Sequence, residues 1–563
     1  MTVRQATAID AIADAYTQRL AALDPVSATY LGISGHDHEM TDYSPAGHAE
    51  MAQLNRDTLA ELAKATPADD TDRVTLAAMK DRLSLSLELD EAGEFLADLN
   101  VIASPLQGLR DVLDVMPTAT TDDWANIASR VSRVPEAVRG YIESLRAGAR
   151  RGLVPAQLQV REGIQQAAEL ADASTSFFVT FTGDATPDGA AASGALANDL
   201  ATAGRAAAAA YGELVTFLTD ELAAQAPADD AVGRDRYALW SREFVGAAVD
   251  LDETYEWGLE ELERMAAEQD RIVAEIAGPG ASIEDAIAKL ETDPARVLHG
   301  KDALREWMQS TADEAIAALD GVHFDLAEPI RKIECVIAPT ENGGIYYTGP
   351  SDDFSRPGRM WWSVPPGVTE FSTWREKTTV YHEGVPGHHL QIAQAVLNRS
   401  QLNSWRRLVS WSSGHGEGWA LYAERLMEEF GFMDDLGDRL GLVDGQRMRA
   451  TRVVLDIGVH CRKPAPERWG GGTWDAAKAW ECFNANVNMD ESFLRFELNR
   501  YLGWPGQAPS YKIGQRLWET YRAQASAAAA AAGEEFSLKD FHTRALNLGS
   551  VPLAVFPEAL GLS

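Results

Sequence analysis

Cysteine is scarce in this chain of 563 residues. The three cysteines, Cys335, Cys461 and Cys482, lie far apart, and no two of them have the spacing of paired metal ligands. A disulfide framework and a thiolate zinc site both require cysteines in close or regular pairs, so neither is expected here. We therefore expect the protein to work in a reducing compartment.

Long apolar stretches are also missing. No uninterrupted apolar segment is long enough to span a bilayer, and the first residues lack the basic start and apolar core of a secretory signal. Both absences predict a cytoplasmic protein that has no membrane partner.

Basic residues are few compared with acidic ones. The chain has 50 Lys and Arg against 85 Asp and Glu, and the resulting net charge of −35 is spread along the sequence. Nucleic acids and anionic membrane surfaces attract positively charged proteins, which disfavours both as partners. The expected partner is a short peptide or another small-molecule substrate.

Helical periodicity is abundant in the first part of the chain. Apolar residues such as Ile9, Ala13, Tyr16 and Leu20 recur every three to four positions, and similar stripes follow through most of the first 330 residues. The fold class is therefore predicted to be mainly α. Because the length exceeds the usual size of one hydrophobic core, we expect two lobes on either side of a deep cleft.

The composition changes after residue 330. Segments 331–339, 343–348 and 358–364 carry β-branched and aromatic residues between turn signals, which predicts a small β-sheet. We assign residues 1–330 to a helical lobe that forms one cleft wall. Residues 331–563 are assigned to a catalytic lobe with the small sheet, zinc-binding helices and C-terminal helices.

A cluster of histidines follows the predicted sheet. His382 and Glu383 are followed by His388 and His389 within the next six residues. In the H-E-x-x-H pattern of zinc hydrolases, two histidines one helical turn apart bind the metal and the glutamate acts as general base. Here the fourth position after His382 is Pro386, so the usual helical geometry does not apply.

Either later histidine could be the second ligand. On an ideal helix His389 returns to the face of His382 but lies about 10 Å further along the axis, whereas His388 is about 120° off that face. Pro386 and Gly387 should bulge or break the helix between the histidines. Such a break could bring His388 to the metal. The unused histidine could then hydrogen-bond substrate or a residue that supports the metal ligands.

A carboxylate further along the chain can complete the metal site. Glu417 opens a predicted amphipathic helix, and Glu424 lies two turns later on the same face. We expect His382, His388 and Glu417 to bind Zn²⁺, with Glu383 as the general base. Glu424 would orient a ligand or pair with an arginine.

These motifs resemble those of a bacterial domain-of-unknown-function family, number 885, which is grouped with gluzincin-type metallopeptidases. The matching positions are His382-Glu383, residues 386–391, 417–422, 456–460, 505–508 and 511–514. The resemblance implies a largely helical fold similar to thimet oligopeptidase and the thermophile-type metallocarboxypeptidases, with zinc at the floor of a long cleft. The altered histidine spacing belongs to this family pattern. Residues 358–364 resemble the edge strand that gluzincins hold above the zinc helix.

Further residues are candidates for supporting roles. An oxyanion formed during amide hydrolysis needs a hydrogen-bond donor, for which we consider Tyr511 and His460, the latter four residues after Asp456. The candidates for binding substrate are His389, His415, Arg500 and Tyr501. Ordinary structural roles are the alternative for each of these residues.

The sequence predicts a zinc-dependent hydrolase that cleaves an amide bond in short peptides. One alternative keeps the metal but places a non-peptide amide or a modified amino-acid conjugate in the cleft. A second alternative is a non-catalytic helical binding protein.

Overall fold

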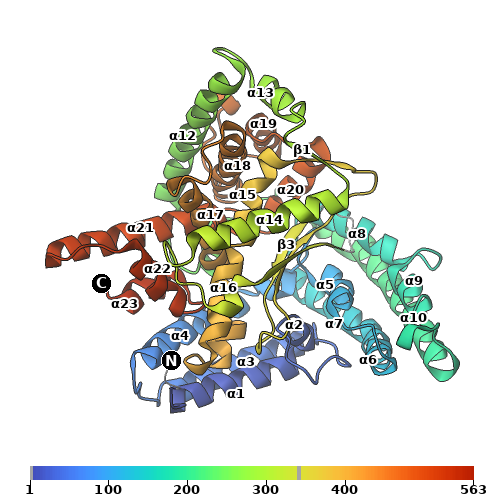
Figure 1. Ribbon diagram of the computed structural model, residues 1–563. Helices are drawn as coiled ribbons and strands as arrows, with labels where there is room; N and C mark the ends of the chain where they lie inside the picture. Colours follow the sequence, from blue (N-terminus) through green and yellow to red (C-terminus); the bar gives the residue numbers. More distant parts are fainter. Residues whose placement is uncertain (1–3, 339–343, 563) are drawn as a thin grey trace.

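The computed structural model describes residues 4–338 and 344–562, and this part of the chain is mainly helical (Figure 1). The prediction of a mainly α fold is confirmed. None of the described helices is both long and apolar enough to cross a membrane.

Helices before the small sheet follow one another with short connections. Many begin at a capping residue, as in the first helix, where Thr7 accepts a hydrogen bond from the backbone of Asp10. Their bounds are α1 (Ala8–Leu23), α2 (Pro25–Tyr30), α3 (Pro45–Leu62), α4 (Asp70–Ala92), α5 (Pro105–Asp111), α6 (Thr121–Ser132), α7 (Val134–Arg150), α8 (Gln157–Ala171), α9 (Phe177–Gly183), α10 (Gly194–Phe217), α11 (Arg234–Val245), α12 (Leu251–Ala277), α13 (Ile283–Glu291) and α14 (Lys301–Leu319).

A second series of helices follows the sheet. They are α15 (Thr373–Glu383), α16 (His388–Leu397), α17 (Ser413–Glu429), α18 (Leu436–His460), α19 (Ala476–Asn486), α20 (Glu491–Gly503), α21 (Ser510–Ala532), α22 (Leu538–Asn547) and α23 (Phe556–Leu560). The long helix α18 packs against α12 and α15, and α17 packs against α21. In Figure 1, α18 lies among α12, α15 and α19 in the upper part of the molecule.

The predicted small sheet is present as three strands. They are β2 (Ile333–Ile337), β3 (Ile345–Thr348) and β4 (Gly358–Trp362), in the order β2-β4-β3, with β2 parallel and β3 antiparallel to β4. Two further strands, β1 (Val297–His299) and β5 (Glu370–Ser372), pair with each other. The interpretation of residues 358–364 as an edge strand was wrong, because β4 uses both of its sides for pairing within the sheet. The edge strands are β2 and β3.

The hydrophobic cores do not divide at residue 330. The largest core contains Ala13 of α1 and Leu560 of α23, together with side chains of α14, the sheet and α15 to α17. A second core lies wholly within the first part of the chain and involves α5 to α10, which form the arm at the lower right of Figure 1. Residue 330 is therefore not a boundary between separately packed cores.

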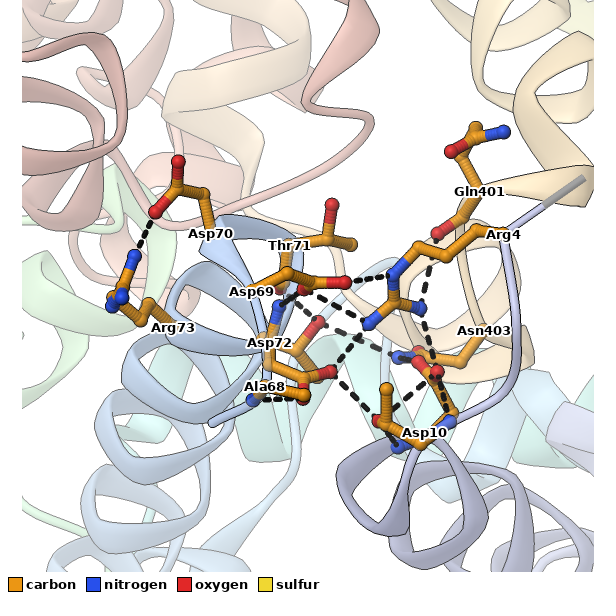
Figure 2. Close-up of polar contacts among 12 residues, drawn as sticks. Arg4, Asp10, Ala68, Asp69, Asp70, Thr71, Asp72, Arg73, Gln401 and Asn403 are labelled. Carbon is orange, nitrogen blue, oxygen red and sulfur yellow. Dashed lines mark hydrogen bonds and ion pairs between the residues drawn. The ribbon is translucent and has the colours of Figure 1, made fainter. Parts of the chain in front are cut away.

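A buried charge network attaches the start of the described chain to the largest core (Figure 2). The guanidinium of Arg4 forms ion pairs with Asp10, Asp69 and Asp72, at 2.6 Å from Asp10 and 2.7 Å from Asp69. Asn403 donates a further hydrogen bond of 3.0 Å to Asp10. Arg4 thus links carboxylates of α1 and of the start of α4, next to Asn403 in the segment that follows α16.

Candidate metal centre

The helix that carries His382 stops where the sequence predicts a break. Helix α15 ends at Glu383 and α16 begins at His388, with a cis peptide bond between Val385 and Pro386. Gly387 fits this junction because it lacks a side chain, since a Cβ atom there would lie 1.9 Å from the carbonyl oxygen of His382. The predicted interruption at Pro386 and Gly387 is confirmed.

The break brings two imidazoles and one carboxylate together. One donor atom from each of His382, His388 and Glu417 lies within 4.8 Å of the other two. The Oε2 atom of Glu417 is 3.3 Å from Nε2 of His382 and 3.4 Å from Nε2 of His388. Donor atoms about 2.1 Å from a tetrahedral zinc ion lie about 3.4 Å apart, so the residue types and the two distances from Glu417 fit a zinc site.

Glu424 fixes the orientation of the first histidine. Nδ1 of His382 donates to Oε1 of Glu424 at 2.8 Å, and the hydroxyl of Thr378 donates to the other carboxylate oxygen at 2.8 Å. This arrangement leaves Nε2 of His382 facing Glu417, as in the carboxylate–histidine pairs that support metal ligands. The expectation that Glu424 orients a ligand agrees with this geometry.

Opposite charges interact strongly among these residues. Burial alone would raise the pKa of Glu417, but the adjacent His388 and His382 hold it well below its usual range. Burial alone would lower the pKa of His382, but hydrogen bonds to Glu417 and Glu424 raise it to about 10. A metal ion bound here would take the place of the proton on His382 as the positive charge beside the two carboxylates.

Glu383 lies beside the ligand group and lines the same cavity as His382, His388 and Glu417. Its side chain is buried, and burial raises the pKa of the carboxyl although the two imidazoles oppose the shift. A carboxylate whose pKa is raised towards neutral is a more effective general base.

Tyr511, at the start of α21, also lines this cavity. The guanidinium of Arg452 lies 5.0 Å from the centre of the tyrosine ring. Burial raises the pKa of Tyr511 to about 12, so its hydroxyl remains a hydrogen-bond donor at neutral pH. Of the two predicted oxyanion donors, Tyr511 is the one that lines the cavity with the candidate metal ligands.

Arg500 and Tyr501 lie outside the residues that line the cavity, contrary to the expectation that they contact substrate. Arg500 donates to Glu497 at 3.0 and 2.9 Å, and the hydroxyl of Tyr501 donates to the same carboxylate at 2.6 Å. Glu497 also accepts a 2.9 Å bond from Arg452. Arg500 and Tyr501 therefore belong to the buried network that holds Arg452. In this network the carboxylate of Glu497 pairs with both guanidinium groups, as buried charges require.

The other predicted histidines are also outside the cavity lining. His389 is fully buried, donates to the carbonyl of Ile330 at 2.7 Å and accepts from the hydroxyl of Tyr347 at 2.8 Å. The ring of His415 accepts a bond of 3.3 Å from Gln391, and burial lowers its pKa to about 3. Both imidazoles are thus engaged within the protein.

His460 is fully buried at the end of α18. Its Nε2 donates to the carbonyl of Tyr501 at 3.0 Å and lies 4.0 Å from Asp456. Asp456 instead accepts hydrogen bonds from Tyr237 and from the backbone of Gly506. The two side chains thus lie in ion-pair range without a hydrogen bond between them, and neither lines the cavity. Their hydrogen bonds join α18 to its neighbours.

The cavity around the centre has a volume of about 750 Å³. Its walls come from β3, the segment after β4, helices α15 to α18, and the starts of α20 and α21. They include charged residues that the sequence reasoning missed, Glu376, Arg449 and Arg452. Glu376 is seven residues before Glu383 on α15, and Arg449 and Arg452 are one turn apart on α18. Helical spacing could have indicated that Glu376 shares a face of α15 with Glu383, and that Arg449 and Arg452 share a face of α18. It could not have indicated that these two helix faces line the same cavity.

Comparison with known proteins places the chain in a family. The family model described as "Bacterial protein of unknown function (DUF885)" matches residues 25–560. The chain belongs to this family. No curated protein matches the chain.

Two solved structures share the fold. A protein from Colwellia psychrerythraea, described as a "putative lipoprotein", has 22% identity and a TM-score of 0.82, with 98% of each chain covered. A second, of unknown function and from Shewanella oneidensis, has 16% identity and a TM-score of 0.75, with 99% of this chain and 100% of that chain covered. At these identities the likeness concerns the fold alone.

Proposed function

We propose that this protein is a zinc-dependent hydrolase that cleaves an amide bond, with short peptides as its substrates. The observation that carries the proposal is the convergence of His382, His388 and Glu417 beside the buried Glu383 in one cavity. This arrangement repeats the functional elements of gluzincin-type metallopeptidases, two histidines, one glutamate ligand and an adjacent glutamate. A cavity of about 750 Å³ suits a short substrate rather than a folded protein.

Each residue would have a defined part in the reaction. A zinc ion held by His382, His388 and Glu417 would supply Lewis acidity to a water molecule and to the substrate carbonyl. Glu383 would accept a proton from the water and pass it to the amine that leaves. Tyr511 would donate a hydrogen bond to the carbonyl oxygen as negative charge develops there.

The proposal is tested by separating metal binding from catalysis. Glu383→Gln is expected to retain zinc but to lose at least about a hundredfold in turnover of short peptides, the usual contribution of a general base. Full turnover in this variant would contradict the assigned role. A screen that also contains N-acyl amino acids would reveal a non-peptide amide substrate.

A matched histidine pair tests the ligand assignment. His388→Ala should abolish tight zinc binding, whereas His389→Ala should retain it, because only His388 reaches Glu417. Metal analysis of both purified variants provides the measurement. A wild-type protein that takes up no zinc and hydrolyses no amide would instead favour a non-catalytic binding protein.

A further inference from the structure

Three arginines line the cavity, and two of them have acidic partners. Arg375 lies 3.7 Å from Asp444, and Arg452 lies 2.9 Å from Glu497. Arg449 forms no ion pair within 4.0 Å among residues 4–338 and 344–562, although the chain has a net charge of −35. An arginine that the protein leaves unpaired in a cavity is available to a ligand anion.

The hydrogen bonds of Arg449 lead to the same conclusion. Within the described part of the chain, its guanidinium makes one bond, of 3.2 Å from Nη1 to the carbonyl of Gly445 in its own helix. Its Nε atom is buried and has no hydrogen-bond partner there. A ligand cannot reach the buried Nε, but an acceptor at the terminal nitrogens would add to the single bond that the guanidinium makes.

Arg449 lines the same cavity as Tyr511 and the candidate metal ligands His382, His388 and Glu417. It is one turn before Arg452, whose guanidinium packs over the ring of Tyr511. A group bound to Arg449 would therefore share this cavity with the amide that the proposed function places there.

We infer that Arg449 binds a free carboxylate of the substrate, so that the amide cleaved is the one adjacent to a C-terminal α-carboxylate. This inference rests on the proposed hydrolase function and specifies its substrate class, which is peptides or N-acyl amino acids with a free α-carboxylate. The planar guanidinium can form two parallel hydrogen bonds with a carboxylate, and an α-carboxylate is only two bonds from the amide nitrogen. Arg452 is less available, because Tyr501 and Glu497 already accept its hydrogen bonds.

The reaction is a hydrolysis that releases one amino acid. Water forms a C–O bond to the carbonyl carbon, the C–N bond breaks, and the amine nitrogen receives the proton that Glu383 removed from the water. The products are an amino acid and a shortened peptide or acyl group that ends in a new carboxylate. Water is the only co-reactant.

The side chain next to the carboxylate is expected to be apolar. Large hydrophobic side chains that are 38 to 46% exposed line this cavity, namely Tyr346, Val368, Trp411 and Met489. Exposed apolar surface in a cavity indicates a site for an apolar group. N-acetylphenylalanine and peptides that end in phenylalanine are therefore suitable probes.

The test compares a free carboxylate with its amide. Wild-type protein should hydrolyse a peptide ending in phenylalanine, and Arg449→Met should raise KM for it about 10- to 100-fold, as expected for lost hydrogen bonds to a charged group. The much slower hydrolysis of the same peptide with a C-terminal amide should not change. Arg447→Met is the control, because Arg447 lies on α18 but donates to Asn486 and Gln269 instead of lining the cavity.

Two results would overturn the inference. One is equal hydrolysis of the free and amidated peptides by wild-type protein. The other is an equal loss on both peptides in Arg449→Met, which would show that Arg449 only balances the charge of Glu424.

A binding measurement separates this inference from the proposed function. Zinc-loaded Glu383→Gln protein should bind N-acetylphenylalanine more tightly than its amide in calorimetric titration, and adding Arg449→Met should remove the difference. If no amide is hydrolysed by wild-type protein but this preference is present, the hydrolase proposal fails and the carboxylate site stands. Equal binding of acid and amide refutes the carboxylate site whatever the turnover.

Discussion

Substitution of Gly387 by alanine tests whether the junction between α15 and α16 creates the metal centre. A Cβ atom at this position would lie 1.9 Å from the carbonyl oxygen of His382 and 2.5 Å from that of Tyr381, whereas real Cβ contacts stay beyond 3.0 Å. The carbonyl of His382 must therefore move by about 1 Å or the junction must open. Metal–ligand distances tolerate only about 0.2 Å, so such a shift should remove one ligand from the site.

The expected loss can be measured directly. Gly387→Ala should weaken zinc binding by at least about a hundredfold, or about 2.8 kcal/mol at 1.4 kcal/mol per tenfold. The free energy of unfolding should fall by about 1 to 3 kcal/mol, as for other overpacked sites. Competition with a chromophoric zinc chelator measures the affinity, and denaturant unfolding of the metal-free protein measures the stability.

Gly212→Ala is the matched control. Gly212 lies in α10, and a Cβ atom there would meet no heavy atom within 4 Å. This variant should bind zinc as the wild type does and gain up to about 1 kcal/mol from the higher helix propensity of alanine. If Gly387→Ala bound zinc within threefold of the wild type, the close backbone approach would not be what positions His382 and His388.

Two further predictions concern charges. Arg4→Ala should lower the free energy of unfolding by about 3 kcal/mol at pH 7, because it leaves buried carboxylates unpaired. The control Arg73→Ala removes an exposed pair with Asp70 (Figure 2) and should change the free energy of unfolding by less than about 0.5 kcal/mol. The pKa values of Asp10 and Asp69 are lowered in the folded protein, so the destabilisation caused by Arg4→Ala should become smaller below about pH 4. If urea unfolding gave the same difference in free energy between variant and wild type down to pH 2, this explanation would be refuted. Burial raises the pKa of the Glu376 carboxyl to about 7, so its ionisation destabilises the folded protein increasingly as the pH rises above about 4.5. Glu376→Gln should therefore stabilise the protein at pH 8, by at most about 3.5 kcal/mol at 1.4 kcal/mol per pKa unit, and have no effect at pH 4. Glu370→Gln, in an exposed pair with His299, should have no effect at either pH. Melting curves of the Glu376 variant that differ from the wild type equally at both pH values would contradict this assignment.

Local sequence was sufficient to predict part of the centre. His382, Glu383 and His388 lie within seven residues. Pro386 and Gly387 are unfavourable inside a continuous helix, so the sequence predicts an interruption between the two histidines. The choice between His388 and His389 needed the structure, since it depends on where Ile330 and Tyr347 lie.

Residues far apart in sequence could not be placed from their spacing. The four-residue interval between Asp456 and His460 indicated a pair, but long-range contacts with Tyr237, Gly506 and Tyr501 determine the orientation of both side chains. The guanidinium of Arg449 is likewise available because no described acidic side chain pairs with it, and its spacing in the sequence does not reveal this. A pattern in one helix contains no information about the partners that other helices provide.

The continuity of the largest core across α1, α16, α17 and α23 has a consequence for biosynthesis. A chain that emerges from the ribosome amino end first cannot complete this core until α23 has been made. The core that includes α16 and α17 therefore stays incomplete while residues 398–555 are being synthesised. The candidate ligands His388 and Glu417, which these two helices carry, should reach their final arrangement only after α23 has emerged.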